Sequence, residues 1–480
     1  MGREGFITAV TLAREDLEQQ IRDRVGEAFK GLMHALYRQE GAMLQVEIIQ
    51  EPEVTDFIST HADVLNQAMK QAPLTDAMRH RLERSNFIFS GFKAFHELNE
   101  AFPSLIDENG ERKPFERFLN DVQAIDSTYN RNYLRAEYNF CQASADMAAK
   151  WEQIVADGDR YNLQYRTQHD DKVRPEHAAL DGVTLPPSDP FWESYYPPNG
   201  WNCRCTVAQV RKSKYPVTDP EEARARGEEA LQKDTRGIFR FNSGKQGKTF
   251  PDYNPYTISR CRDCDIAQGK VNLAYIPDNE FCNACPLIRE CASKMEQRQK
   301  YERYKNDPDY FNVQYDEKTG AVRATHKGHN CIHNPKDDQR FFGNMTKEDL
   351  EEECVSNIFR MGHSAILRDE GALLRLKQTP AALDLELDDN IMDIASITGK
   401  HCGGALSRKN DQLQRVYEQS RIESDCVCLY FHKAEMFSES QLLHDVVWYK
   451  QKMVEWNQPR LIKHIYCVIN GADDILIYDI

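Results

Sequence analysis

The chain has 480 residues, of which 40% are hydrophobic and 29% are charged, and its formal net charge is -15. This length predicts two to four domains, and the acidic balance argues against binding nucleic acid over a broad surface. No apolar run approaches the roughly 18 residues that a membrane span needs, and the first residues lack the apolar core of an export signal. We therefore expect no membrane contact and a reducing compartment, where closely spaced pairs among the fourteen cysteines favour metal over disulfide.

Residues 1–112 are predicted to be a mainly helical region. Apolar side chains recur at steps of three and four from Leu17 to Leu36, which is the pattern of one buried helix face. Two shorter helices are predicted over 56–71 and 75–84, with Thr75 as the N-cap of the second. Nothing in this region indicates catalysis, so we expect it to serve packing or assembly.

The strongest helical pattern begins at Lys113-Pro114, where a proline in the first turn is tolerated. Apolar and aromatic residues then recur at helical spacing as far as Trp151, which predicts a helix on the order of 50 Å long. We expect its aromatic stripe to face the core. Alternation over 161–167 predicts a strand after this helix.

The stretch from Arg174 to Cys205 combines six prolines with five large aromatic side chains. The prolines and Asn199-Gly200 break regular structure while the aromatic rings require burial, so an ordered, irregular loop is expected. The arrangement of His177, Gly182, the Asp189–Trp192 cluster and PPNGWNCRC closely resembles the phage Mu protein F-like head morphogenesis domain. Members of that family are minor head proteins of tailed phages and prophages, and a long helix precedes their motif.

His177, Cys203 and Cys205 in this loop allow two interpretations. The three side chains are suitable zinc ligands, although Cys-x-Cys spacing is less usual than Cys-x2-Cys and no fourth ligand is evident. Alternatively, they are buried thiols beside a hydrogen-bonded histidine. The sequence leaves both interpretations open, and it places the resembling domain at 113–212.

Residues 213–250 are polar and are predicted to be a linker with a short helix. Within them NSGKQGKT, residues 242–249, imitates a phosphate-binding loop. Asn242 stands where that loop needs glycine, and Phe250-Pro251 prevents the helix that would hold a phosphate. We therefore reject nucleotide binding at this motif.

Residues 251–300 are predicted to form a small zinc-binding connector. Two Cys-x2-Cys pairs stand seventeen residues apart, and their members are Cys261, Cys264, Cys282 and Cys285. Four thiolates in this spacing suit one structural zinc ion, which would supply folding energy to a segment with little core. Free thiols and an iron–sulfur cluster are the alternatives, and Cys291 is a spare ligand.

Residues 301–480 are predicted to form an α/β domain. Strands are expected over 364–368, 383–387, 391–397, 426–431, 464–469 and 475–478, and helices over about 407–420 and 438–456. Asn470-Gly471 predicts a hairpin turn between the last two strands.

Three stretches of this domain, ATHKGH from Ala324, GHSAIL from Gly362 and DIAS from Asp393, are similar to domains fused behind Mu F-like modules. Those domains are grouped with the barnase–EndoU–colicin–RelE-like nucleases. The resemblance implies metal-independent RNA cleavage, with His326 and His329 as the acid–base pair and Asp393 orienting one of them. That family more often has glutamate at the position of Asp393.

Two other interpretations of these histidines remain. They can form a loop held by structural hydrogen bonds, or His329, Cys331 and His333 can bind zinc.

The sequence as a whole predicts a multidomain α+β protein: a helical N-terminal region with a Mu F-like domain, a zinc connector and a nuclease-like C-terminal domain. The resemblance implies a prophage minor head protein whose partners are portal and capsid proteins. Host RNA and an immunity protein would be partners of the C-terminal domain. The protein would act in the host cytoplasm during assembly and then lie inside the virion. The alternative is a purely structural head protein with a non-catalytic C-terminal binding module.

Overall fold

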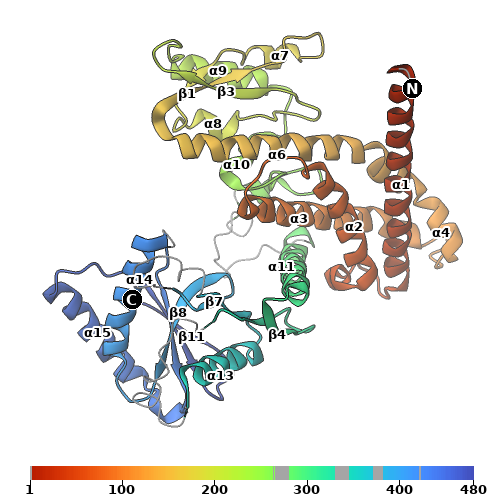
Figure 1. The fold of residues 1–480 in the computed structure, drawn as a ribbon. Coiled ribbons are helices and arrows are strands. Elements are labelled where there is room, and N and C mark those ends of the chain that lie inside the picture. The colour runs from red at the N-terminus through yellow and green to blue at the C-terminus, as the bar shows by residue number, and fades with distance from the viewer. Residues whose placement is uncertain (1–2, 263, 265–279, 330–344, 371–381, 421–422) are drawn as a thin grey trace. The chain divides into compact units, whose positions relative to one another are not determined.

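The computed structural model describes residues 3–262, 264, 280–329, 345–370, 382–420 and 423–480 (Figure 1). These residues mix helix and sheet, and they divide into two compact units, Met1–Ala292 and Ser293–Ile480. The boundary falls within one helix, α11 (Glu280–Asn306). The described residues thus form two units, whereas the sequence predicts five segments.

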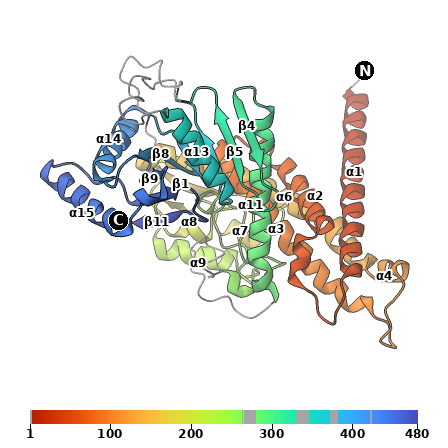
Figure 2. The same cartoon turned by 90° about the horizontal axis from the view of Figure 1, so that it is seen from below.

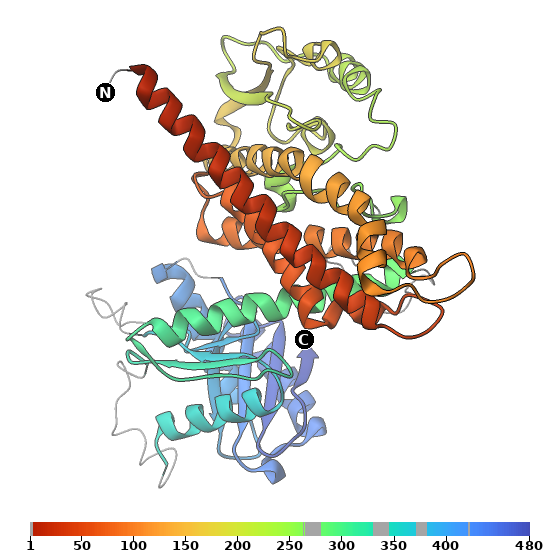
Figure 3. The same cartoon turned by 90° about the vertical axis from the view of Figure 1, so that its right-hand side faces the viewer.

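Long helices build the first part of the N-terminal unit: α1 (Arg3–Arg38), α2 (Pro52–Ala68) and α3 (Asp76–Ala101). α1 is 36 residues long, and its N-terminal end extends beyond α2 and α3 (Figure 3). The predicted N-cap is confirmed, because the Thr75 hydroxyl accepts the Met78 N–H at 3.2 Å. α3 extends well past the predicted end at Arg84, and the phenylalanine side chains of this extension are buried.

The predicted 50 Å helix is interrupted. It consists of α4 (Phe115–Asp121), α5 (Gln123–Asp126), a π-helical turn (Ser127–Asn132) and α6 (Leu134–Asp157). Lys93 of α3 donates to the Tyr129 carbonyl at 2.8 Å, so a backbone acceptor inside the π turn is used by a side chain. The aromatic stripe faces the core at Phe118, Phe140 and Trp151, which are buried, but Tyr133 of the same stripe is exposed.

The second part of the N-terminal unit contains an antiparallel sheet with strand order β2-β1-β3. β1 (Tyr161–Arg166), β2 (Thr184–Leu185) and β3 (Thr206–Arg211) enclose the irregular loop, which also holds α7 (Pro175–Ala178) and α8 (Phe191–Ser194). Trp192 and Tyr196 of the loop are fully buried in a core shared with α6. The prediction of an ordered, buried loop is confirmed.

Residues 213–250, expected as a linker, pack into the same unit. α9 (Pro220–Ala230) contributes Ala223 and Ala230 to the core beside Trp192. The NSGKQGKT segment forms only the single turn α10 (Ser243–Gln246), and Thr249 is buried and donates to Asn86 at 2.6 Å. No helix follows Lys248-Thr249 directly, which agrees with the prediction that this segment is not a phosphate-binding loop.

Among the described residues, short 3-10 helices lie at Val46–Gln50, Phe102–Leu105, Gly158–Arg160, Ser259–Arg262 and Ala434–Met436. In the described part of the chain, no helix has the length and apolar character needed to cross a membrane.

The C-terminal unit is built on an eight-stranded mixed sheet of order β11-β10-β9-β8-β7-β6-β5-β4. Its strands are β4 (Tyr310–Tyr315), β5 (Val322–His326), β6 (Ala365–Leu367), β7 (Leu385–Leu387), β8 (Asn390–Ile397), β9 (Cys426–Phe431), β10 (His464–Ile469) and β11 (Leu476–Asp479). The six predicted strands are confirmed, and so is the β10–β11 hairpin. β4 and β5 were not predicted.

Helices cover both faces of this sheet. α14 (Gly403–Ser420) and α15 (Glu439–Glu455) pack on the face that carries Val427, Leu429 and Phe431 of β9. α13 (Lys347–Arg360), which was not predicted, packs on the opposite face against Cys428 and Tyr430. The last turns of α11 lie along β4 and β5 (Figure 2), where Tyr304 is buried against Val322 and Ala324.

Candidate functional site

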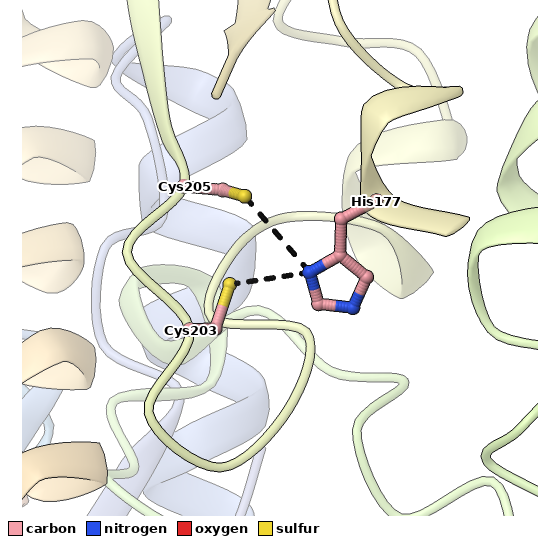
Figure 4. Close-up of side chains that lie close together, drawn as sticks. All are labelled: His177, Cys203 and Cys205. Carbon is pink, nitrogen blue, oxygen red and sulfur yellow. Dashed lines mark hydrogen bonds between the residues drawn. The ribbon is translucent and has the colours of Figure 1, made fainter. Parts of the chain in front are cut away.

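Two cysteines and a histidine meet inside the irregular loop of the N-terminal unit. His177 comes from α7, and Cys203 and Cys205 stand just before β3. Nδ1 of His177 lies 3.7 Å from the Cys203 sulfur and 3.9 Å from the Cys205 sulfur (Figure 4). The three potential ligand atoms all lie within 4.8 Å of one another. The structure therefore brings together all three residues that the sequence singles out in this loop.

Neighbouring contacts hold the loop in this shape. The Arg174 guanidinium donates to the Trp201 carbonyl at 2.5 Å, and it packs so closely on Gly200 that a Cβ there would lie 2.9 Å from it. The buried Tyr165 hydroxyl of β1 donates to the Asn199 side chain at 2.8 Å. The Tyr165 contact is buried and the Arg174 contact is half-buried, and both hold the loop on the N-terminal side of Cys203.

The electrostatics of the site favour one ionised sulfur. Cys203 and His177 are buried and Cys205 is half-buried. A hydrogen bond from the Cys205 thiol, together with the neighbouring His177, holds the pKa of Cys203 well below its usual range. Among the described residues, no fourth histidine, cysteine or carboxylate joins the group.

The four cysteines of the predicted connector are less closely assembled. Cys261 lies in the 3-10 helix Ser259–Arg262, and Cys282 and Cys285 lie in the first turns of α11. Burial, together with the neighbouring cysteines, raises the pKa of Cys261 to about 11, so the thiols lie near one another. In the part of the chain that the structure describes, however, only the group around His177 has three ligand atoms within 4.8 Å. Residues 265–279, between Cys264 and α11, lie outside that part.

His326, the first predicted catalytic residue, ends β5. Its Nδ1 accepts the Gly328 N–H at 2.9 Å and lies 3.6 Å from an Asp369 carboxylate oxygen. The edge of Tyr310 packs against the ring, with 4.9 Å between ring centroids. Because Nδ1 accepts a hydrogen bond, the neutral ring carries its proton on Nε2.

His329, the second predicted catalytic residue, is buried three positions further on. Its Nε2 lies 2.9 Å from a Glu351 carboxylate oxygen of α13, and its Nδ1 is buried with no hydrogen-bond partner among the described residues. Burial alone would lower the pKa of this imidazole, but the hydrogen bond and charge of Glu351 outweigh that effect, and the pKa is raised. Cys331 and His333, the other proposed ligands here, lie outside the described residues.

Asp393, the third predicted catalytic residue, lies on β8 and contacts neither histidine. Its carboxylate accepts from Lys409 Nζ of α14 at 2.7 Å. The hydrogen bond that was expected from Asp393 to a histidine comes instead from Glu351 to His329. The orienting role predicted for Asp393 is therefore not what this geometry provides.

Asp393 instead shares a buried site with a second carboxyl group. Asp384 stands just before β7, one position beyond the Leu385–Met392 pair that joins β7 to β8. Burial and the charge of Asp384 hold the pKa of Asp393 well above its usual range. Burial acts in the same direction on Asp384, but the charges of Lys347 and Lys409 outweigh it and lower its pKa. The two carboxyl groups thus share one proton.

These groups belong to one larger assembly, which we call the sheet charge cluster. Lys347 of α13 is its centre, 3.0 Å from Glu351, 3.4 Å from Asp384 and 3.8 Å from Glu370. Its members are His329, Lys347, Glu351, Glu370, Asp384, Asp393 and Lys409. Interacting groups with shifted pKa values are the kind of arrangement that proton-transfer sites use. This cluster, however, is mostly closed to solvent.

Sequence reasoning identified His329 and Asp393 but not their partners. A signal for Glu351 exists, because Thr346 and Asp349 form a capping box that starts a helix, and Lys347 and Glu351 stand four apart on it. Asp384 is the one acidic residue inside the apolar run from Ala382 to Leu385, and a buried carboxylate needs a partner.

Comparison with known proteins places a phage domain in the N-terminal unit. Residues 103–208 match the family described as Phage Mu protein F like protein, and they include α6, β1, β2, the first half of β3 and the loop with His177 and Cys203. The chain therefore contains a Mu F-like domain. The family match confirms the resemblance seen in the sequence and starts ten residues before the predicted boundary at 113.

Two curated relatives match over the same share of the chain. One is the putative capsid assembly protein F of Escherichia phage Mu, 36% identical over 111 residues. The other is the Mu-like prophage FluMu F protein of Haemophilus influenzae, 33% identical over 112 residues. Each match covers 23% of this chain and 23% of the relative. No solved structure matches the chain.

Proposed function

We propose that this chain is a phage or prophage head protein that acts in head assembly through its Mu F-like domain. The match of residues 103–208 carries this proposal, since one relative over that segment is named as a capsid assembly protein. Portal and capsid proteins are the proposed partners, in the host cytoplasm during assembly and afterwards in the virion. The proposal extends beyond the matched segment, which is about a quarter of each relative.

Head assembly can be tested in a lysogen from which the gene has been deleted. We expect few DNA-filled heads in electron micrographs of the induced lysate, and restored heads that contain the chain when the gene is supplied in trans. Trp192→Ala, which empties the core beneath the loop, should fail to restore them. Trp456→Ala, at an exposed site in the C-terminal unit, is the matched control. Normal heads without the gene would contradict the proposal.

We also propose, as a second function, that the C-terminal unit cleaves host RNA without a metal ion. The supporting observation is the sheet charge cluster beside His326, in which Glu351 raises the pKa of His329 so that this imidazole stays protonated at higher pH. In such a reaction His329 would donate a proton to the leaving oxygen, and His326 would contact the reacting group. An active nuclease would also require an immunity partner in the host that makes it.

RNA cleavage can be tested by inducing the full chain in a bacterial host and examining total RNA. Growth arrest with discrete RNA fragments is expected, and both should disappear in the His329→Gln variant and in His326→Ala. His444→Ala is the control, because His444 is exposed on α15 and lies outside the cluster. Intact RNA with a folded, unmodified chain would favour the non-catalytic binding module.

We propose in addition that Cys261, Cys264, Cys282 and Cys285 hold a structural zinc ion. Burial raises the pKa values of Cys261 and Cys285, and neighbouring cysteine thiols add to this effect. Together with the placement of Cys282 and Cys285 one turn apart on α11, this supports the proposal. A Cys261→Ser variant should contain one zinc ion fewer per chain than the unmodified protein in elemental analysis. Equal zinc content in the two would contradict it.

A further inference from the structure

We propose that His177, Cys203 and Cys205 bind a single zinc ion inside the Mu F-like domain, with a solvent molecule as the fourth ligand. This site is separate from the connector cysteines, and the proposal goes beyond the role in head assembly. It rests on the positions of three side chains, on the lone pairs they offer and on the way the surrounding loop holds them.

The distances between the three atoms match a tetrahedral ion. Zinc bonds of about 2.0 Å to nitrogen and about 2.3 Å to sulfur place a nitrogen and a sulfur ligand about 3.6 Å apart. The observed separations from Nδ1 are 3.7 Å to Cys203 and 3.9 Å to Cys205. All three atoms converge on the same small volume (Figure 4). Movements of a few tenths of an ångström would bring both nitrogen–sulfur distances to the tetrahedral value.

Hydrogen bonding alone accounts poorly for this arrangement. A neutral imidazole nitrogen has one lone pair and accepts one hydrogen bond well. Here two sulfur atoms approach the same Nδ1, and they do so from two positions of one loop separated by a single residue. One cation placed between the three atoms would engage the nitrogen lone pair and both sulfurs at once.

The charge balance also suits a buried site. A zinc ion with two thiolates and a neutral imidazole carries no net charge, which avoids the cost of burying an isolated ion. Arg174 and Tyr165 bond to Trp201 and Asn199 of the same loop, close to Cys203 in the chain. Such neighbours are typical of the residues that orient metal ligands from behind.

The ion would close a loop that has little regular structure. His177 and Cys203 are 26 residues apart, and between them the chain forms only the four-residue helix α8 and the two-residue strand β2. Linking its two ends restricts the unfolded chain and so stabilises the folded loop. Three protein ligands leave one position of the tetrahedron for solvent, since no fourth side chain of a ligating type joins the group among the described residues.

The first experiment measures zinc in the purified full chain, kept reduced and supplied with zinc. Cys203→Ser and His177→Ala should each contain one zinc ion fewer per chain than the unmodified protein, and His177→Cys should keep it. His169→Ala is the matched control, since this exposed histidine of the same loop region lies outside the group. Cys261→Ser alters only the connector site, so a loss of zinc in that variant is distinguishable from a loss of zinc at His177.

A second measurement avoids variants that fold poorly. Alkylation of Cys205, the half-buried thiol, should be slow in the zinc-loaded unmodified protein and at least tenfold faster after a chelator removes the ion. In a Cys261→Ser background, which lacks the connector site, cobalt loading should give thiolate absorption that falls by about half when Cys205→Ser is added. Zinc content unchanged in folded Cys203→Ser, or Cys205 alkylation independent of zinc, would overturn the proposal.

Discussion

Both units bury a cluster of charged side chains, and the two clusters are built differently. The N-terminal unit contains what we call the helical charge cluster: His61, Lys93, Glu97 and Glu137, on α2, α3 and α6, together with Tyr256. Lys93 Nζ lies 2.8 Å from Glu137 and 3.2 Å from Nε2 of His61. Tyr256 donates to the other oxygen of Glu137. One ammonium group thus faces one carboxylate.

The remaining members of the helical cluster are neutral near pH 7. Burial raises the pKa of Glu97 to about 8, and burial with the charge of Lys93 lowers the pKa of His61 to about 4. Burial opposes ionisation of Glu137, but Lys93 and His61 outweigh it and lower its pKa to about 2. This cluster is therefore a single ion pair surrounded by neutral hydrogen-bonding groups, which is how a packed helical core tolerates charge.

The sheet charge cluster has no such one-to-one pairing. Its four carboxyl groups, two ammonium groups and one imidazole share protons, most clearly at Asp384 and Asp393. Its histidine has a raised pKa, whereas the histidine of the helical cluster has a lowered one. Both clusters are buried, so burial does not distinguish them. The distinguishing feature is a set of interacting groups whose protons can be redistributed.

The largest expected effect is on the helical cluster. Lys93→Met leaves the Glu137 carboxylate buried without its ammonium partner, which should reduce the free energy of unfolding of the N-terminal unit by about 3–5 kcal/mol. Urea denaturation followed by circular dichroism measures this loss. Lys30→Met, which removes an exposed ion pair with Glu27, is the control and should change little. A loss below about 1 kcal/mol for Lys93→Met, which is the size expected of an exposed ion pair, would contradict the single-pair description.

The second prediction separates the two carboxyl groups of the sheet cluster. Asp384 carries the negative charge and Asp393 the shared proton, so Asp384→Asn should destabilise the C-terminal unit by about 3 kcal/mol. Asp393→Asn, which resembles the protonated acid, should cost about 1 kcal/mol. The two variants are matched controls for each other in the same denaturation experiment. The reverse order of effects would assign the proton to Asp384.

The third prediction concerns pH and the N-terminal unit. Glu97 has a folded pKa above its unfolded value, so its contribution to stability is complete below about pH 4.5 and is lost as pH rises towards 8. His61 has a lowered pKa, so stability rises with pH between 4 and 6.5 and offsets the loss at Glu97 over that range.

Between pH 6.5 and 8 only the loss at Glu97 remains, and it amounts to about 2 kcal/mol at roughly 1.4 kcal/mol per pH unit. Thermal unfolding of the N-terminal unit across this range should therefore show a steeper decline in the unmodified chain than in Glu97→Gln. A decline of equal size in both would show that another group is responsible.

The smallest expected effect is at His329. Its folded pKa is raised, so the stability it contributes is present below about pH 6.5 and is lost as pH rises through the folded value. Glu351→Gln should weaken that dependence and lower the pKa of His329, which can be followed by NMR of its ring protons. An unchanged pKa in Glu351→Gln would remove the main difference between the two clusters.

The sequence predicted best those elements whose side chains are buried as a continuous run. β9 and β10 were predicted at their observed bounds, because Cys426–Phe431 is buried throughout and His464–Ile469 nearly so. β4 was missed because most of Tyr310–Tyr315 is exposed or half-buried and Asn312 adopts a positive φ of 52°, which interrupts any alternation.

Packing between distant segments explains the other differences. Residues 213–250 seemed a linker because α9 is rich in charge, but its buried residues are small. Gly227 packs so closely on the ring of Tyr195 that a Cβ would lie 2.7 Å from it. For the candidate sites, the sequence supplied His177, Cys203 and Cys205 because they share one loop. It did not supply Glu351, which reaches His329 from a separate helix.

The segment that follows the Mu F-like domain, from Gly244 to Tyr256, packs against the N-terminal helices. Gly244 lies against Trp151 with no room for a Cβ, Phe250 stacks on Phe89 at 3.7 Å, and Tyr256 reaches Glu137. Residues 103–208, which match the family, are thus in contact with segments that precede and follow them in the chain. The segment that matches the family, residues 103–208, is therefore shorter than the unit in which it packs, Met1–Ala292. A graft or excision at the family boundary would cut through a shared interior, so exchange between such proteins has to carry the flanking segments along.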